Sequence, residues 1–475
     1  NDAPTVVNDT DSVTEGGTVD ETTNSAGTVL SDDSDVDGDT LTVSGTVTQT
    51  SATANGGSSI TISSPNSGSV GSAVTGYYGQ LTLDSDGTYS YVANQSNADA
   101  LDDSESGTDV FTFTVSDGTT TTSSTITFTV NGANDAPTVV NDTDSVTEGG
   151  TVDETTNSAG TVLSDDSDVD GDTLTVSGTV TQTSATANGG SSITISSPNS
   201  GSVGSAVTGY YGQLTLDSDG TYSYVANQSN ADALDDSESG TDVFTFTVSD
   251  GTTTTSSTIT FTVNGANDAP TASNNTVTTN EDTTYTFTAS DFGFSDVDGD
   301  TLSSVTVSGL TGSDGTFSLN GVAITSSTTV TKTQIDNGLL TFAPDSNENG
   351  SSYNTFTFTV NDGTTNSSSS YTMTVDVTAV NDAPTVVNDT DSVTEGGTVD
   401  ETTNSAGTVL SDDSDVDGDT LTVSGTVTQT SATANGGSSI TISSPNSGSV
   451  GSAVTGYYGQ LTLDSDGTYS YVANQ

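Results

Sequence analysis

An acidic stretch recurs four times along the chain, and its residue types and spacing are typical of metal binding. The stretch is Asp-Val-Asp-Gly-Asp-Thr-Leu, and its three carboxylates repel one another unless a divalent cation lies among them. Calcium takes about six to eight oxygen ligands on flexible loops, and the glycine permits the tight turn that brings the carboxylates together. The expected calcium ligands are Asp35, Asp37 and Asp39, Asp168, Asp170 and Asp172, Asp296, Asp298 and Asp300, and Asp415, Asp417 and Asp419.

Two other interpretations of this stretch are possible: the start of an EF-hand loop, and a solvated turn that binds no metal. The acids from Asp33 to Gly38 are spaced as at the start of an EF-hand loop. Ser44 stands where that loop requires a glutamate, however, and Phe294 replaces Asp33 in the third copy. The other alternative is a solvated turn of aspartate and glycine. Because the stretch recurs four times, once within a divergent part of the chain, we favour calcium binding.

A second stretch, Asn-Asp-Ala-Pro, keeps step with the acidic one and begins at Asn1, Asn134, Asn267 and Asn381. Proline fixes φ and lacks a backbone donor, so the stretch suits the start of a first strand or a plain linker. The Asn134 carbonyl and Asp135 would complete a calcium site together with Glu148 and the acidic stretch of the neighbouring repeat. An ion shared in this way stiffens the joint, whereas a plain linker leaves its two sides hinged.

The elements that must position these acids belong to four internal repeats. Residues 1–133 (repeat 1) and 134–266 (repeat 2) are identical, residues 267–380 (repeat 3) differ in sequence, and residues 381–475 (repeat 4) copy residues 1–95. We expect each repeat to be one domain. Repeat 4 does not hold the counterpart of residues 96–133, so we expect its sheet to be completed by further chain or by strand addition from another chain.

Alternating apolar and Thr or Ser residues predict strands throughout, and no segment has helical periodicity with caps at both ends. Residues 80–83 and 88–91 flank an Asp-Ser-Asp-Gly turn, which predicts a hairpin. Residues 110–115 and 126–130 predict a second hairpin. The expected core residues are Phe111, Phe113, Val115, Ile126, Phe128 and Val130. Short strands at regular spacing favour an all-β chain of tandem β-sandwiches.

The charge balance excludes several classes of partner. The chain of 475 residues has 64 acids and a single base, Lys332, for a net charge of −63. Nucleic acid and anionic lipid headgroups would be repelled. No apolar run is long enough for membrane insertion.

Catalysis has little chemical basis here. The chain has no His, Cys or Arg to activate a nucleophile or stabilise an oxyanion, and a pair of carboxylates is uninformative among so many acids. We therefore expect no enzyme. Tyr77 and Tyr78 are the one candidate for a carbohydrate platform, although packing at a core or edge is the favoured interpretation.

The motifs in order resemble a known family. Thr-Val-Thr-Glu-Gly-Gly, Asp-Val-Asp-Gly-Asp-Thr-Leu, Gly-Gln-Leu-Thr-Leu-Asp-Ser-Asp-Gly-Thr-Tyr-Ser-Tyr, Phe-Thr-Phe-Thr-Val-Ser-Asp-Gly and Asn-Asp-Ala-Pro resemble the VCBS repeat of giant bacterial surface proteins. Repeat 3, with Asn280-Glu281-Asp282 and the run from Pro344 to Gly350, resembles the bacterial cadherin-like, tandem-95 repeat. The resemblance implies immunoglobulin- or cadherin-like sandwiches in an extracellular, calcium-loaded stalk, as in repeats-in-toxin adhesins and biofilm proteins.

The resemblance also implies a ligand set. Matched residue by residue, the cadherin-like metal pattern comprises Glu15, Asp35, Asp37, Asp117, Asn134 and Asp135, with Glu148, Asp250, Asn267 and Asp268 as their counterparts after repeat 1, Glu281, Asp296, Asp298, Asp362 and Asp382 in and after repeat 3, and Asn381 and Glu395 in repeat 4. The glycine-aspartate nonapeptides that bind calcium elsewhere in such proteins do not occur.

The sequence thus predicts a mechanical, calcium-binding string of β-sandwiches outside a bacterial cell, whose partners are its own neighbouring repeats. Without calcium, carboxylate repulsion should loosen or unfold the repeats. The alternative is a self-assembling filament or matrix protein in which repeats of separate copies pair.

Overall fold

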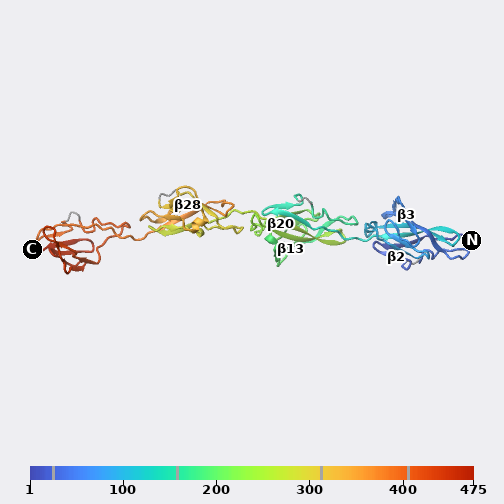
Figure 1. Ribbon diagram of the computed structural model, residues 1–475, viewed down its shortest axis with the longest axis horizontal. Helices are drawn as coiled ribbons and strands as arrows, with labels where there is room; N and C mark the ends of the chain where they lie inside the picture. Colours follow the sequence, from blue (N-terminus) through green and yellow to red (C-terminus); the bar gives the residue numbers. More distant parts are fainter. Residues whose placement is uncertain (24–26, 157–159, 311–313, 404–406) are drawn as a thin grey trace. The chain divides into compact units, whose positions relative to one another are not determined.

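The computed structural model describes residues 1–23, 27–156, 160–310, 314–403 and 407–475, which fall into two compact units, Asn1–Asp268 and Ala269–Gln475. Strands form nearly all of the regular structure (Figure 1), so the prediction of an all-β chain of tandem sandwiches is confirmed. Among the described residues, no helix is both long and apolar enough to cross a membrane.

Repeats 1 and 2 each contain two sheets. In repeat 1 one sheet has the order β1-β10-β9-β3-β4, with β5 also paired to β3, and the other has the order β2-β8-β7-β6. Its elements are β1 (Asp9–Thr14), β2 (Thr18–Asp20), β3 (Thr42–Thr53), η1 (Asn55–Gly57), β4 (Ser59–Ile60), β5 (Ser67–Ser69), β6 (Val74–Thr75), β7 (Gln80–Leu83), β8 (Tyr89–Val92), α1 (Ser96–Asp99), β9 (Ser106–Ser116) and β10 (Thr121–Asn131). Repeat 2 repeats this order with β11 (Asp142–Thr147), β12 (Thr151–Asp153), β13 (Thr175–Thr186), η2 (Asn188–Gly190), β14 (Ser192–Ile193), β15 (Ser200–Ser202), β16 (Val207–Thr208), β17 (Gln213–Leu216), β18 (Tyr222–Val225), β19 (Ser239–Ser249) and β20 (Thr254–Asn264).

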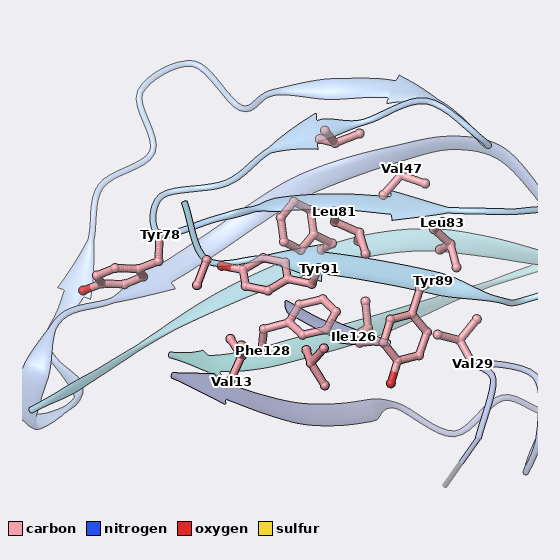
Figure 2. Packing of buried hydrophobic residues seen from close by; sticks show 14 of the residues in the cluster. Val13, Val29, Val47, Tyr78, Leu81, Leu83, Tyr89, Tyr91, Ile126 and Phe128 are labelled. Carbon is pink, nitrogen blue, oxygen red and sulfur yellow. The ribbon is translucent and has the colours of Figure 1, made fainter. Parts of the chain in front are cut away.

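The second predicted hairpin holds the core of repeat 1 together. Strands β9 and β10 are longer than expected, pair antiparallel with Phe111 opposite Ile126, and place all six expected core residues in the interior. Strand β10 also pairs in parallel with β1. Figure 2 shows the rings of Tyr91 and Phe128 lying together between the sheets, where their centroids are 4.1 Å apart. The hairpin therefore joins the first strand to the rest of the fold and supplies its largest side chains.

A fully buried carboxylate, Asp109 on β9, lies at one edge of this core. It accepts hydrogen bonds from Gln49 Nε2 at 3.0 Å and from the Tyr91 hydroxyl at 2.6 Å. The backbone N–H groups of Tyr77, Tyr78 and residue 79 donate to it at 2.9, 2.9 and 3.2 Å. Five donors offset the cost of burying this charge. Tyr78 is only 2% exposed, so it is a packed residue in repeat 1 and no part of an exposed carbohydrate platform.

Repeat 3 has the same plan with a different sequence. Its sheets have the orders β21-β29-β28-β23-β26 and β22-β27-β24-β25. The elements are β21 (Asn275–Asn280), β22 (Tyr285–Thr286), η3 (Ala289–Phe292), β23 (Ser304–Ser308), β24 (Thr316–Leu319), β25 (Val322–Ala323), β26 (Thr328–Thr331), α2 (Lys332–Asp336), β27 (Leu340–Ala343), β28 (Gly350–Asn361) and β29 (Tyr371–Thr378).

Repeat 4 retains one sheet of four strands, in the order β30-β37-β36-β35, and two pairs, β31-β34 and β32-β33. Its elements are β30 (Thr398–Asp400), β31 (Thr426–Thr428), β32 (Ala432–Thr433), β33 (Ser439–Ile440), β34 (Ser447–Ser449), β35 (Val454–Thr455), β36 (Gly459–Leu463) and β37 (Tyr469–Ala473). The four-stranded sheet corresponds to β2-β8-β7-β6 of repeat 1.

Candidate metal centre

The acidic stretch forms a closed turn in each repeat. Oxygens of Asp35, Asp37 and Asp39 all lie within 4.8 Å of one another. Asp35 Oδ1 accepts hydrogen bonds from the backbone N–H groups of Asp37 at 2.8 Å and of Asp39 at 3.4 Å, and Gly38 has φ +81°. The first aspartate accepts the same two bonds in the turns that begin at Asp168, Asp296 and Asp415. The turn thus presents three carboxylates on one side of a left-handed glycine.

The Asn-Asp-Ala-Pro stretch packs against the acidic turn of its own repeat. The N–H of Asp2 donates to Asp37 Oδ2 at 2.7 Å, and Asp135 and Asp382 do the same to Asp170 and Asp417, also at 2.7 Å. An isolated β-bridge at the residue directly after the proline, such as that from Thr138 to Ser167, holds the two segments together in every repeat. The two recurring stretches therefore form one structure at the start of each repeat.

The aspartate in the turn after β9 joins the same cluster. Asn1 Nδ2 donates to Asp117 Oδ2 at 2.7 Å, and Asn134 Nδ2 donates to Asp250 Oδ2 at 3.0 Å. Hydrogen bonds from the backbone of Thr120 and neighbouring donors hold the pKa of Asp117 well below its usual range. Burial raises the pKa of Asp250, but donation from Thr253 and Asn134 outweighs burial and lowers it overall. Both groups are thus ionised at any physiological pH.

The carboxylate of Glu15 lies at the opposite end of repeat 1, next to the linker to repeat 2. Its backbone N–H bonds to the Asn131 carbonyl at 2.9 Å, beside the linker residue Ala133. Burial first, and then the charges of Asp135, Asp170 and Asp99, raise the pKa of Glu15 to about 7, against a hydrogen bond from the Ala133 backbone that lowers it. Glu15 therefore lies close enough to the acidic turn of repeat 2 for their charges to interact across the linker.

This geometry corrects one predicted grouping. Glu148 does not join Asn134 and Asp135, because it lies at the other end of repeat 2, where its Oε1 accepts the N–H of Ala266 at 3.0 Å. Glu15 takes the place that was expected of Glu148. Each such glutamate follows the first strand of its repeat, and the parallel pairing of that strand with the last one carries the glutamate to the end of the repeat.

Three further acids at this junction were not predicted from the sequence. Asp102 and Asp103 both contribute to the raised pKa of Asp172 after burial, and Asp99 acts on Glu15. A Cβ at residue 132 would lie 1.9 Å from the Leu101 carbonyl oxygen, so only glycine lets this acidic segment lie against the linker. The signal in the sequence was the adjacent pair of aspartates shortly before the long hairpin.

The junction between repeats 3 and 4 has a similar composition. Glu281, which is buried, accepts a hydrogen bond from the N–H of Val380 in the linker. Burial and the charges of Asp282, Asp417, Glu281 and Asp415 raise the pKa of Asp382. The side-chain amide of Asn347 lies 2.8 Å from Asp382 Oδ2. Asp282 and Asn347 are thus additions to the predicted set.

The other predicted ligands repeat contacts of the first two repeats or, in the case of Glu395, lie elsewhere. Asn267 Nδ2 and Asn381 Nδ2 donate to the Asp268 and Asp382 carbonyls. Asp362 accepts the N–H groups of Thr364 and Thr365, each at 2.6 Å, as Asp117 does in repeat 1. Glu395 lies in the wall of a cavity lined by Tyr457, Tyr458 and Tyr471.

Several oxygens of these clusters are buried and, among the described residues, have no hydrogen-bond partner. They are Glu15 Oε2, Asp35 Oδ2, Asn134 Oδ1, Asp168 Oδ2, Asp170 Oδ1 and Asp296 Oδ2. A buried oxygen without a donor is costly, and several of them facing one another are still more so. Oxygen ligands, carboxylates and a backbone cradle on loops are the donor set that calcium prefers. The residues at these junctions therefore fit a calcium ion.

Comparisons with known proteins agree with this architecture. Residues 1–132 and 134–265 match the profile of the bacterial cadherin-like domain, and residues 267–378 match that of a bacterial Ig domain. No curated protein matches the chain.

Solved structures show remote likenesses. Protocadherin gamma B2 extracellular cadherin domains 1–5 are 13% identical with a TM-score of 0.33, over 84% of this chain and 64% of that one. A three-Ig fragment of titin is 8% identical with a TM-score of 0.26, over 79% and 99%. An endo-fucoidan hydrolase of glycoside hydrolase family 107 is 18% identical with a TM-score of 0.20, over 66% of this chain and 39% of its own length. These scores are low, so the fold assignment follows from the sheets and the family match.

Proposed function

Since the chain belongs to the bacterial cadherin-like domain family, we propose that it is an extracellular stalk segment whose repeats are stiffened by calcium at their junctions. Its bacterial cadherin-like and Ig domains make it an adhesion or surface repeat protein. The finer proposal is that it projects or links something outside a bacterial cell, in a large surface adhesin or biofilm protein. It is not proposed to be an enzyme.

One observation carries the proposal. The charges of Asp135 and Asp170, from the start of repeat 2, help to raise the pKa of Glu15 at the end of repeat 1, across a short linker. Buried oxygens of Glu15 and Asp170 have no hydrogen-bond partner within the described part of the chain. Without a cation, these groups push the two repeats apart. A bound cation would offset this repulsion, because carboxylates from both repeats would coordinate it together.

Each residue of the junction has a distinct part in this proposal. Glu15, Asp170 and the rest of the acidic turn would hold the ion through carboxylate oxygens, and Asp102 and Asp103 add charge beside them. The N–H of Asp135 fixes Asp170 before any ion binds. Calcium supplies the positive charge that this chain, with a single lysine, does not have. Extracellular modules bind calcium with a Kd of about 10⁻⁴ to 10⁻³ M.

The test is to compare the chain with and without calcium by calorimetry and small-angle scattering. We expect chelation to lower the melting temperature and to reduce the maximum dimension in solution, because the junctions become hinges. Glu15→Gln should raise the calcium concentration needed for stiffening by roughly tenfold, because ligand charge sets affinity in such sites. Glu395→Gln is the matched control, since Glu395 has the same flanking sequence but lines a cavity together with tyrosine side chains.

An unchanged melting temperature and an unchanged maximum dimension after chelation would refute the stiffened stalk. An equal effect of the two glutamine variants would show that the junction is not the site of action.

A second candidate, pairing between separate copies, is favoured by the open face of repeat 4. A cavity of about 430 Å³ there is lined by apolar and aromatic residues that include Val399, Leu461 and Tyr469. Tyr457 and Tyr458 are 55% and 50% exposed. Large exposed apolar patches commonly mark interaction sites. Sedimentation velocity checks this candidate, and a monomer at high protein concentration would argue against it.

A further inference from the structure

A second pair of acids, one buried and one partly buried, lies in repeat 1, apart from the cluster at the junction. Asp9 opens β1 and is only 7% exposed. Asp33 precedes Ser34, whose N–H and carbonyl both bond to Thr5. Asp33 Oδ1 accepts the N–H of Val7 at 2.8 Å, so it is held beside the segment that leads into β1. The backbone thus brings the two carboxylates to the same place from separate parts of the chain.

Each of these acids has one oxygen that lacks a donor. Asp9 Oδ2 and Asp33 Oδ2 are buried, and no group in the described residues hydrogen bonds to them. After burial, the charges of Asp32 and Asp33 raise the pKa of Asp9 to about 7, so the three carboxylates are close enough to repel one another. Burying one donor-free oxygen from each of two neighbouring carboxylates is unfavourable unless something positive lies between them.

Repeat 2 has the same arrangement. Asp142 is also 7% exposed, and Asp166 Oδ1 accepts the N–H of Val140 at 2.8 Å. Asp142 Oδ2 and Asp166 Oδ2 are buried and have no hydrogen-bond partner in the parts of repeat 2 that the structure describes. The unpartnered pair is therefore a property of this repeat type.

Repeat 3 shows what replaces the pair. Asn275 occupies the first position of β21, as Asp9 does in β1, and Phe294 precedes Ser295 where Asp33 precedes Ser34. Asn275 Nδ2 donates to the Asp291 carbonyl at 2.8 Å. Both acids are thus exchanged together, one for a neutral amide that finds an acceptor and the other for an apolar ring. This is expected if the two acids serve one bound ligand.

The compensating charge cannot come from a side chain. Repeats 1 and 2 contain no Lys, Arg or His, and Lys332 in repeat 3 pairs with Asp336. The acidic turn is a separate group, because Asp35, Asp37 and Asp39 have oxygens within 4.8 Å of one another and neither Asp9 nor Asp33 belongs to that group. The strand from Asp9 to Glu15 spans about 20 Å at ~3.3 Å per residue, so the glutamate end of the repeat is also out of reach.

We propose that Asp9 and Asp33 bind a divalent cation of the calcium class within repeat 1, and that Asp142 and Asp166 bind its counterpart in repeat 2. Water and Asp32 complete the coordination, since calcium needs about six to eight oxygens. This site is additional to the junction sites, and it makes the fold of the single repeat, rather than only its joints, depend on calcium.

The experiment counts calcium ions bound to the full chain by equilibrium dialysis with radioactive calcium. The double variant Asp9→Asn and Asp142→Asn should bind one ion fewer for each substituted repeat. Asp389→Asn is the matched control, because Asp389 has the same neighbours in sequence but is exposed, and it should leave the count unchanged. An unchanged count in the double variant would overturn the proposal and indicate that the two carboxylates share a proton instead.

A second variant covers the case in which asparagine alone unfolds the repeat. Asp9→Asn with Asp33→Phe, and Asp142→Asn with Asp166→Phe, reproduce the pair found in repeat 3. We expect this variant to bind fewer ions and yet to melt in chelator at no lower a temperature than the parent chain. A lower melting temperature in chelator would contradict the proposal. The count is independent of the maximum dimension in solution, so failure of this site and failure of the stiffened stalk are distinguishable.

Discussion

Residues 1–95 and 381–475 have the same sequence, but they form different amounts of sheet. Strand β3 is continuous from Thr42 to Thr53, whereas the identical residues of repeat 4 form only the short strands β31 and β32. Residues 389–394, identical to β1, form no strand. The sheet β30-β37-β36-β35 nevertheless survives, because all four of its strands come from the shared residues.

The difference follows from the hairpin of β9 and β10. In repeat 1 the strands β3 and β1 pair with β9 and β10, and in repeat 4 no described segment takes those places. Strands without partners leave backbone N–H and C=O groups to water and do not stay extended. The lesson is that this sandwich has one sheet that its first 95 residues can form and another that depends on a distant segment.

The strongest test of this comparison is Asp109→Ala in repeat 1. The substitution leaves five donors around the carboxylate without an acceptor, and losing a buried charged partner costs about 3–5 kcal/mol. We expect repeat 1 to lose the pairing of β1 and β3 with the hairpin, which the described part of repeat 4 also lacks, with fast hydrogen exchange in both strands. Exchange in the identical repeat 2 is the internal control, and protection of β3 that stays unchanged would contradict the role of Asp109.

Tyr78→Ala and Tyr458→Ala make the same substitution at equivalent positions of repeat 1 and repeat 4. Tyr78 is buried and its hydroxyl donates to the Thr53 carbonyl, so its removal should cost about 3–5 kcal/mol. Tyr458 is half exposed, so its loss should cost less than about 1 kcal/mol. Denaturant unfolding checks both, and equal costs would mean that repeat 4 is closed in solution.

The pH dependence of the stability of repeat 1 should change sign when calcium is removed. In chelator, folded Asp9 titrates at about 7 instead of 3.8, and folded Glu15 at about 7 instead of 4.5. Between the ordinary and the raised pKa values, the folded state keeps protons that the unfolded state has released. The free energy of unfolding therefore falls as pH rises from about 4 to 7. With calcium the trend should reverse, because the ion binds the deprotonated groups. Calorimetric melting across this range, with and without chelator, is the measurement, and a metal-free melting temperature that rises with pH would be the contrary result.

The smallest difference is expected at a shared local turn. Gly87 and Gly467 have φ of +89° and +83°, and a Cβ on either would lie 2.7 Å from a leucine side chain, that of Leu30 or Leu410. Alanine at either position should cost about 1 kcal/mol or more, since the backbone is left-handed. The two costs should agree within about 0.5 kcal/mol, because the turn forms without the distant hairpin. Unequal costs, measured by denaturant unfolding, would show that β9 and β10 also stabilise the four-stranded sheet that contains this turn.

Much of the local structure was predictable from residue patterns. Alternation identified the hairpin of β9 and β10 and its six core residues, since a buried strand face must be apolar at every second position. The Asp and Gly spacing identified the acidic turn, because its hydrogen bonds run between residues two and four apart. The short helix α2 was missed although Thr331 and Gln334 form its capping box, because a single turn has no periodicity to detect.

Other features needed the tertiary structure. Asp109 looks like any other acid in the sequence, and only the packing of β9 against residues 77–79 shows that five donors surround it. Glu148 was assigned to the wrong end of its repeat, because the length and direction of the strand that precedes it set its place. The pair of Asp9 and Asp33 was invisible for the same reason, since 24 positions separate them in the chain.

The sequence by itself therefore determined the strands, the turns and the acidic character of the joints, which depend on residues within a few positions of one another. Only the tertiary structure decided which acids share a site and which faces are closed. Those outcomes rest on contacts between segments far apart in the chain, above all the parallel pairing of β1 with β10. Repeat 4 shows the physical reason, because the same residues without that pairing keep their turns and lose their second sheet.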